Sequence, residues 1–317
     1  MGRYRRLGAD PPFGDPRRGH GIAMEGYYWR LSDPASGRVI VALCGVCQSA
    51  EGPWAVVAVA AHPQGVLREG FAPDAWAEPG GYGVRAAGLL EAGDGRLSVD
   101  LGPDTAIHAG LSDRAAWPRA AYGALGPAHW VPGLGQYWHP HLLDARAAGH
   151  ATIAGEHVDL TGWHVYGEKN WGSGFPRRWW WGQAHGFERE DVCVAFAGGR
   201  LPGAPVSATA LVVRLGDELV RLSAPTALVR AGSTMTDWHV TGTGPRHRVE
   251  LEGTAGADPF MLPVPLPAER RTEPGAAQHL AGSVRLRVRR GRRLVYEGHS
   301  ALAGLEHGDA AQPPASA

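Results

Sequence analysis

The sequence has very little lysine and asparagine. Lys169 is its only lysine, and its only asparagine, Asn170, is the next residue. Arginine replaces lysine everywhere else, and together with abundant alanine, glycine and proline this composition is typical of GC-rich coding. Because such a bias acts against both residues, their occurrence side by side marks the segment around them as a candidate functional region.

Cysteine is also scarce. Three cysteines cannot form a disulfide framework, which favours a reducing compartment. Cys44 and Cys47 form a C-x-x-C pattern, but they lie in a β-branched run and not at the start of a helix, where a redox thiol gains its low pKa. A zinc site would need a second pair of ligands that the sequence does not place. We therefore expect both cysteines to have packing roles.

The chain lacks an excess of either charge and lacks long apolar runs. The 31 acidic residues balance the 31 basic ones, so no global field attracts nucleic acid. The longest apolar runs, VIVALCGV and WAVVAVAA, have the length of strands, and the basic start has no apolar signal core. We expect a cytoplasmic protein that does not bind nucleic acid.

No segment has the pattern of an amphipathic helix. Short apolar or alternating runs recur between turn signals such as SDPASG, EAGDG, RLGDE and RRGRR, which is typical of an all-β chain made of hairpins. A single antiparallel sheet of roughly eighteen to twenty strands would curl or split. We therefore predict an all-β fold of two antiparallel β-barrel or sandwich domains packed together.

A weak internal repeat supports two domains. YYWRLSDPASGRVIVALCG, from Tyr27, and WWWGQAHGFEREDVCVAFAG, from Trp179, share an aromatic triplet, a polar hairpin and an apolar strand. From this repeat and the composition of the termini we predict four segments: a disordered N-terminal arm over 1–20, an N-terminal β domain over 21–155, a C-terminal β domain over 156–307 and a flexible tail over 308–317.

Strand geometry sorts the residues around Lys169, because alternate side chains point to opposite faces. One face of the strand expected from Trp163 carries mainly hydrogen-bonding groups: His164, Tyr166, Glu168 and Asn170. The opposite face carries Trp163, Val165, Lys169 and Trp171.

The following WWWGQAH segment sorts in the same way. Large and polar side chains share one face: Trp179, Trp181, Gln183 and His185. Trp180 lies opposite, beside small residues that allow close packing. We assign the first face to a cavity. Glu25, Tyr27 and Trp29 also share a face, and their matching aromatic and carboxylate pattern predicts that they meet the same cavity.

Two interpretations of these residues remain open. The tryptophans could simply form the core, with Glu168 and Lys169 as a structural ion pair. Several polar groups on the same strand faces would then need buried partners, and an apolar pocket with a few convergent polar groups is the usual form of a small-molecule site. The residues alone thus predict a β-barrel with an aromatic, carboxylate-bearing pocket.

The segment GEKNWGSGFPRRWWWGQA closely resembles the motif of the tocopherol cyclase family, approximately E-K-N-W-G-x-x-F-P-x-R-W-x-W-x-Q. Three further stretches resemble the family in order: MEGYYWRL its first strand, GLGQYWHPHLL its mid-chain segment and HLAGSVRLRVRRGRRLVYEGHSALAGLE its closing strands. The resemblance covers about residues 24 to 307. His185 departs from it, because the family often has asparagine there, and this departure leaves the substrate open. The plastid setting of the plant members does not carry over, and we expect a bacterial protein.

The resemblance implies a lipocalin-like pair of β domains and an enzyme that closes a chromanol ring from a prenylated hydroquinone without a redox cofactor. A proton adds to a trisubstituted alkene, and a phenol oxygen captures the cation. A carboxyl group in an apolar pocket can supply the proton, because burial raises its pKa. Aromatic faces stabilise the cation, and a histidine or an amide network can hold the phenol.

On this basis we assign catalytic roles to Glu168, Glu25 and His185, with either glutamate as the acid. Substrate contacts are assigned to Tyr27, Trp29, Asn170, Trp179, Trp181, Gln183, Tyr166 and His139. Structural roles are assigned to Lys169 and Trp171. Since Lys169 lies on the face opposite to Glu168, we expect it to pair with another carboxylate and to fix the strand.

Two other groups of residues have open roles. His139 and His141 lie on one strand face at a spacing that can bind a metal, but no carboxylate or cysteine completes a ligand set, so we expect no metal and a pocket or packing role. Arg285, Arg287 and Arg289 line one strand face, which fits either a solvated face or peripheral contact with anionic lipid headgroups.

Three functions remain in competition. The first is a cofactor-independent cyclase that acts on a lipophilic prenylated or polyene substrate. The second is a non-catalytic, lipocalin-like carrier of such a molecule, and the third is a hydratase or pericyclic cyclase of specialised metabolism on the same scaffold. A protonatable glutamate favours an enzyme, whereas carboxylates all paired with arginine favour a carrier. In each case the expected partner is a hydrophobic small molecule, bound by a monomer or a homodimer.

Overall fold

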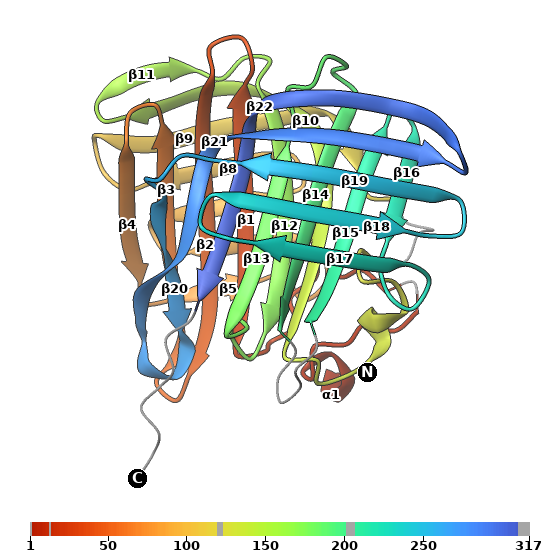
Figure 1. The fold of residues 1–317 in the computed structure, drawn as a ribbon. Helices are drawn as coiled ribbons and strands as arrows, with labels where there is room; N and C mark the ends of the chain where they lie inside the picture. Colours follow the sequence, from red (N-terminus) through yellow and green to blue (C-terminus); the bar gives the residue numbers. More distant parts are fainter. Residues whose placement is uncertain (1, 13, 119–122, 201–206, 310–317) are drawn as a thin grey trace. The chain divides into compact units, whose positions relative to one another are not determined.

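A computed structural model describes residues 2–12, 14–118, 123–200 and 207–309 (Figure 1). In these residues the regular structure other than strands is limited to the helix α1 (Gly2–Arg5) and two 3-10 turns, η1 (Gly126–Trp130) and η2 (Pro267–Glu269). Short apolar runs between turns form strands because alternate side chains can then reach a core. The predicted all-β fold is confirmed.

The chain forms two compact units. Unit 1 contains Met1–Gly174 together with Pro265–Thr272, and unit 2 contains Phe175–Val264 together with Glu273–Ala317. The short second segment of unit 1 is held by side-chain hydrogen bonds. The Trp54 indole N–H, for example, donates to the carbonyl oxygen of Pro267 at 3.0 Å.

The division between the units lies after residue 174 and not near the expected residue 155. β11 (Glu156–Asp159) turns back onto β10 (Gln136–Ile153), and β12 (His164–Gly172) pairs with β1 (Met24–Asp33). Ala154 and Gly155, where we expected the boundary, have φ angles of 53° and 78°. They form a tight hairpin turn within unit 1, and a tight hairpin turn has the same turn chemistry as a linker.

The expected disorder of the N-terminal arm, residues 1–20, is also corrected. Its described residues dock on β12 through backbone carbonyl groups. The Trp171 indole N–H donates to the carbonyl oxygen of Gly8 at 2.7 Å, and the Lys169 ammonium group donates to that of Arg18 at 2.6 Å. Proline- and glycine-rich composition predicted disorder, but buried donors on a distant strand order the segment.

Gly8 gives a test of this docking. Its φ angle is 90°, and a Cβ atom there would lie 2.2 Å from Cε2 of Tyr137. We expect Gly8→Ala to lower the free energy of unfolding by about 1–3 kcal/mol, because both the backbone and the ring must shift. The control is Gly37→Ala, since Gly37 has a φ angle of 70° but open space around it. Urea denaturation would compare them, and equal effects would contradict a docked arm.

Unit 1 is built on one antiparallel sheet of twelve strands. Their order is β4-β3-β2-β1-β12-β10-β9-β8-β7-β6-β5, with β11 paired to β10. β5 and β6 also contact β3, so the sheet curls around its core. The strands not yet given are β2 (Arg38–Ser49), β3 (Gly52–His62), β4 (Val66–Ala72), β5 (Ala75–Ala77), β6 (Gly83–Ala86), β7 (Leu90–Gly93), β8 (Arg96–Asp100) and β9 (Thr105–Ala116).

Unit 2 is built on an antiparallel sheet of ten strands. Their order is β16-β15-β14-β13-β22-β21-β19-β18-β17, with β20 paired to β21, and β15 and β17 are in contact. The strands are β13 (Arg178–Ala184), β14 (Val192–Arg200), β15 (Ser207–Leu215), β16 (Glu218–Leu222), β17 (Leu228–Ser233), β18 (Asp237–Thr243), β19 (His247–Thr254), β20 (Phe260–Leu266), β21 (Arg271–Arg290) and β22 (Arg293–Asp309).

The expected flexible tail, 308–317, begins inside a strand. Gly308 pairs with Trp179 of β13 and with Ala276 of β21, so the last residues of β22 belong to the sheet of unit 2. Residues 310–317 lie outside the described residues.

The arginine-rich face of β21 is accessible and ion-paired. Arg285 and Arg287 both donate to Oε1 of Glu297 on β22, at 2.5 Å and 2.9 Å. No helix in the described part of the chain combines the length and the apolar character needed to cross a membrane.

Candidate functional site

β12 carries different groups on its two faces. Tyr27 of β1 is opposite Lys169, and Tyr28 is opposite Glu168. Directly opposed residues of antiparallel strands point to the same face, so Lys169 lies with Tyr27, which belongs to the core of unit 1, and Glu168 lies on the other face. The predicted separation of Glu168 and Lys169 is confirmed.

Glu25 is buried and ion-paired. Its Oε2 lies 2.7 Å from Nζ of Lys169. The backbone N–H of His20 donates to both carboxylate oxygens, at 2.9 Å and 3.0 Å, and that of Gly21 donates to Oε1 at 2.8 Å. Burial alone would raise the pKa of Glu25, but the charge of Lys169 and the hydrogen bonds of His20 hold it well below its usual range. Glu25 is therefore ionised, which argues against its assignment as the acid.

Lys169 joins the strand to the N-terminal segment. Besides Glu25, its ammonium group contacts Nδ1 of His20 at 3.0 Å and lies 5.1 Å from the centre of the Trp171 ring. Trp171 in turn stacks on Tyr137, with ring centres 5.5 Å apart. Lys169 thus pairs with a carboxylate other than Glu168, as expected. These contacts support the structural roles assigned to Lys169 and Trp171.

Three residues assigned to substrate contacts share the face of Lys169. Trp29 and Tyr27 belong to the core of unit 1, and His139 is directly opposite Lys169. Burial lowers the pKa of His139 well below its usual range, so its ring is neutral, and it packs edge-on against Trp117 at 5.0 Å. Tyr27 and Trp29 therefore lie across the sheet of unit 1 from Glu168.

Glu168 forms a cluster with two aromatic donors on the other face of β12. Its Oε2 accepts hydrogen bonds from the Tyr166 hydroxyl at 2.6 Å and from the Trp138 indole N–H at 2.7 Å. All three side chains are buried. Tyr166 and Glu168, both named as site residues from the sequence, are therefore in direct contact. Asn170, on the same face, instead accepts a hydrogen bond from Gln136 at 3.2 Å.

Sequence reasoning missed Trp138. It lies in the mid-chain segment GLGQYWHPHLL, directly before the two candidate histidines His139 and His141. Its position opposite Asn170 in the β10–β12 pair places it on the polar face. Only the pairing of two strands far apart in sequence reveals this position.

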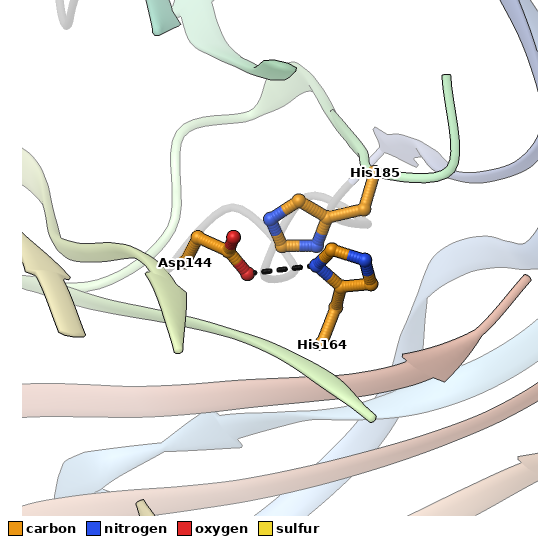
Figure 2. A group of neighbouring side chains, drawn as sticks. All are labelled: Asp144, His164 and His185. Atoms are coloured by element: carbon orange, nitrogen blue, oxygen red, sulfur yellow. Dashed lines mark hydrogen bonds and ion pairs between the residues drawn. The ribbon is translucent and has the colours of Figure 1, made fainter. Parts of the chain in front are cut away.

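A second pair on this face was also missed. Nδ1 of His164 lies 2.8 Å from Oδ1 of Asp144, and the two side chains point toward one another in Figure 2. The guanidinium group of Arg146 lies 3.0 Å from Nε2 of the same ring. Arginine can only donate, so Nε2 accepts and Nδ1–H donates to Asp144. Both ring nitrogens are thus already engaged, and a metal ion would have to displace one of these partners.

The tryptophan row of β13 alternates between the two faces of the unit 2 sheet. Trp180 and Ala184 belong to the core of unit 2, whereas Trp179 and Trp181 point to the other face. Gly182 lies on the core side, where a Cβ atom would be 2.4 Å from the ring of Phe196. The predicted sorting of this segment, with close packing at its small residues, is confirmed.

Trp179 contacts a carboxyl group that sequence reasoning missed. Glu306 of β22 is directly opposite Trp181 and also directly opposite Gln278 of β21. The Trp179 indole N–H donates to its Oε1 at 2.5 Å, and the Gln278 amide donates to its Oε2 at 2.7 Å. Burial raises the pKa of Glu306, although the two hydrogen bonds partly oppose this effect. Alternation along the closing strand could have placed Glu306, but its partner strand was unknown.

A comparison with known families agrees with these observations. The model of the tocopherol cyclase-like family matches residues 111–309, which is more than half of the chain. The protein belongs to this family. The match includes the clusters of both Glu168 and Glu306, whereas Glu25 lies outside it.

Two plant proteins are similar to this tocopherol cyclase-like chain. A probable chloroplastic tocopherol cyclase of Oryza sativa subsp. japonica is 26% identical over 198 residues, covering 57% of this chain and 42% of the plant protein. The chloroplastic tocopherol cyclase of Zea mays is 26% identical over 183 residues, covering 54% and 38%. The matched part is therefore less than half the length of these curated relatives.

Solved structures show that the fold is lipocalin-like, as predicted. Kievitone hydratase from Nectria haematococca has a TM-score of 0.52 at 11% identity, with 92% of this chain and 91% of that chain covered. CghA with Sch210972 has a TM-score of 0.58 at 10% identity, with coverages of 91% and 88%. At these identities the likeness concerns the fold alone.

His185 and Gln183 lie together in this tocopherol cyclase-like chain. The Gln183 amide nitrogen lies 3.3 Å from Nδ1 of His185 and 3.6 Å from Sγ of Cys193. The Ser300 hydroxyl donates to the carbonyl oxygen of His185 at 2.5 Å. All four residues are buried. The residue that departs from the family motif is thus held by its backbone and lies beside the Gln183 amide.

Proposed function

We propose that this chain catalyses an intramolecular ring closure on a lipophilic substrate, a prenylated hydroquinone-like molecule or a polyene, and that protonation of an alkene starts the reaction. Membership of the tocopherol cyclase-like family supports this reaction class. One observation carries the proposal. Two buried carboxyl groups, those of Glu168 and Glu306, each accept a hydrogen bond from a tryptophan indole N–H.

Carboxyl groups in such surroundings suit this chemistry. A carboxyl group protonates an alkene only if it keeps its proton near neutrality, which burial against apolar rings favours. The tertiary cation that forms must be stabilised without capture by water. An indole face contributes roughly 0.5–2 kcal/mol to the stability of a well-placed cation. The phenol oxygen then bonds to the cation and loses its proton, so the product is an isomer of the substrate.

The same first step also allows a second outcome. If water captures the cation, the product gains one water molecule, and a structural neighbour is named as a hydratase. The carrier alternative predicts binding without any change in the ligand. These three outcomes differ in the mass of the recovered molecule and are therefore separable in one experiment.

The test is to incubate the purified protein in heavy water with hydroquinones that carry a trisubstituted prenyl alkene. We expect an isomeric ring product that contains one deuterium atom bonded to carbon beside the new ether carbon, detected by mass spectrometry and NMR. A product with one added water would assign a hydratase. Recovery of bound but unchanged substrate, with no deuterium on carbon, would favour the carrier and contradict the proposal.

A further inference from the structure

Glu306 lies in a face of unit 2 that combines two tryptophans with two amides. Trp179, Trp181 and Gln183 project from β13 on the side of Glu306, and Gln278 projects from β21. Trp181, Gln183 and Glu306 are at most 8% exposed. The indole and amide N–H groups hold the two carboxyl oxygens in place from opposite strands.

The two buried glutamates outside the Glu168 cluster have opposite electrostatic surroundings. Glu25 accepts hydrogen bonds from two backbone N–H groups and pairs with Lys169. Glu306 has only the neutral donors of Trp179 and Gln278, and no ion pair with it occurs in the described residues. A buried carboxyl group with neutral partners favours its protonated form, whereas one beside an ammonium group favours the carboxylate. The raised pKa of Glu306 agrees with this difference.

Gln183 presents a buried acceptor without a partner on the same face. Its amide nitrogen is engaged by His185 and Cys193, but its Oε1 has no hydrogen-bond partner in the described residues. A buried carbonyl oxygen without a hydrogen-bond partner is destabilising unless a ligand or water donates to it. A substrate hydroxyl group would supply that donor.

Small residues flank Gln183 on both neighbouring strands and Trp181 on one of them. Gln183 is directly opposite Ala195 on β14 and Gly304 on β22, and Trp181 is opposite Ala197. Successive residues on one strand face are about 7 Å apart, so Gln183 lies one such step from the register position of Glu306.

We propose that Glu306 is the proton donor of this ring closure and that Oε1 of Gln183 accepts the hydrogen bond of the substrate phenol. This inference rests on the proposed function. The O–H bond of Glu306 breaks as the alkene electrons form a C–H bond at the less substituted carbon. The phenol oxygen then forms a C–O bond to the tertiary cation and releases its proton, and reprotonation of Glu306 completes the cycle. Neither an oxidant nor a reductant is needed.

The arrangement also defines the substrate class. A molecule that uses both groups must carry a phenolic hydroxyl donor close to a trisubstituted alkene, as an ortho-prenylated hydroquinone does. Trp179 and Trp181 lie beside Glu306, so the cation forms next to indole rings. A polyene without a hydroxyl group would leave Oε1 of Gln183 unpaired. We therefore expect the prenylated hydroquinone class to be preferred over polyenes.

The first test needs no substrate. Infrared spectra at neutral pH should show the carbonyl band of a protonated carboxylic acid in the wild type, and Glu306→Gln should lower the intensity of this band. Glu25→Gln is the matched control, because Glu25 is ionised, and it should leave the band in place. An unchanged carbonyl band in Glu306→Gln would overturn the inference.

The second test is kinetic. Glu306→Gln should lower kcat at least about 100-fold, as expected for loss of a general acid. Gln183→Leu should mainly raise KM, by about tenfold, because it removes a hydrogen bond made when the substrate binds. Glu306→Asp keeps an acid and should retain more activity than Glu306→Gln. Equal loss in these two folded variants would assign Glu306 a structural role and overturn the inference.

The two proposals fail in different ways. If the wild type forms no ring product from any prenylated hydroquinone, the proposed function is wrong, and the infrared test still decides whether Glu306 carries a proton. If the wild type forms the ring and Glu306→Gln forms it at the same rate, the proposed function stands and Glu306 is not the donor.

Discussion

Replacement of Lys169 by methionine is expected to lower the free energy of unfolding by about 3–5 kcal/mol. The reason is that removing one partner of a buried ion pair leaves the other charge buried and uncompensated. Lys169 is fully buried and contacts Glu25, the carbonyl oxygen of Arg18 and His20. Urea denaturation followed by tryptophan fluorescence would measure the loss. A change below about 1 kcal/mol would contradict it, because ordinary surface substitutions change stability by up to about 0.5 kcal/mol.

The matched control removes both charges. In the double variant Glu25→Gln and Lys169→Met no charge is left unpaired, so we expect a smaller loss of stability than in Lys169→Met alone. The double variant should also respond less to acid. The pKa of Glu25 is lowered in the fold, so its contribution to stability is present above the ordinary glutamate pKa of about 4.5 and is lost as the pH falls below it. The wild type should therefore lose more stability than the double variant between neutral and acidic pH.

This ion pair also shows what the sequence could and could not predict. Alternation along one strand placed Lys169 and Glu168 on opposite faces, so the need for another carboxylate followed from local geometry. Alternation could not identify Glu25 as that carboxylate, because the β1–β12 pairing joins segments from distant parts of the chain. For the same reason the sequence could not indicate that the pKa of Glu25 is lowered, since this pKa depends on a residue of the partner strand.

The predictions of the domain boundary and of a disordered N-terminal arm were wrong for a different reason. Glycine- and proline-rich composition marks turns, linkers and disordered arms alike. Gly155 belongs to a hairpin turn, and Gly8 is held by a hydrogen bond from Trp171 to its carbonyl oxygen. Composition describes the segment itself, whereas order depends on donors supplied from elsewhere in the fold.

The candidate site shows the same contrast. The sorting of the tryptophan row was predictable because it depends on one strand alone. The acid was assigned to Glu168 or Glu25 from the sequence, and the structure adds the buried carboxyl group of Glu306 beside Trp179. β22 pairs directly with β13, although more than a hundred residues separate the two strands in the chain. A sequence motif can therefore identify the tryptophans of a site without identifying the carboxyl group, which comes from a strand far away in the sequence.

The tryptophan row allows a prediction with its own internal control. Replacement of Trp180 by leucine should lower the free energy of unfolding by about 2–4 kcal/mol, because its ring fills the core of unit 2 and donates to Oγ1 of Thr209. Its side chain points away from the face of Glu306, so the kcat of the folded fraction should stay near that of the wild type. Thermal unfolding and turnover of a prenylated hydroquinone would measure both effects.

Replacement of Trp181 by leucine should lower kcat. Trp181 lies opposite Glu306 on the face that carries Trp179, where an indole ring would stabilise a cation by roughly 0.5–2 kcal/mol. Losing this ring should lower kcat by about 2- to 30-fold, whereas Trp180→Leu should leave kcat near that of the wild type. Trp181→Phe, which keeps an aromatic face, should recover part of the rate. An equal loss of kcat in Trp180→Leu and Trp181→Leu would contradict the assignment of one face of β13 to the core and the other to the reaction, and the cation would then have to form elsewhere.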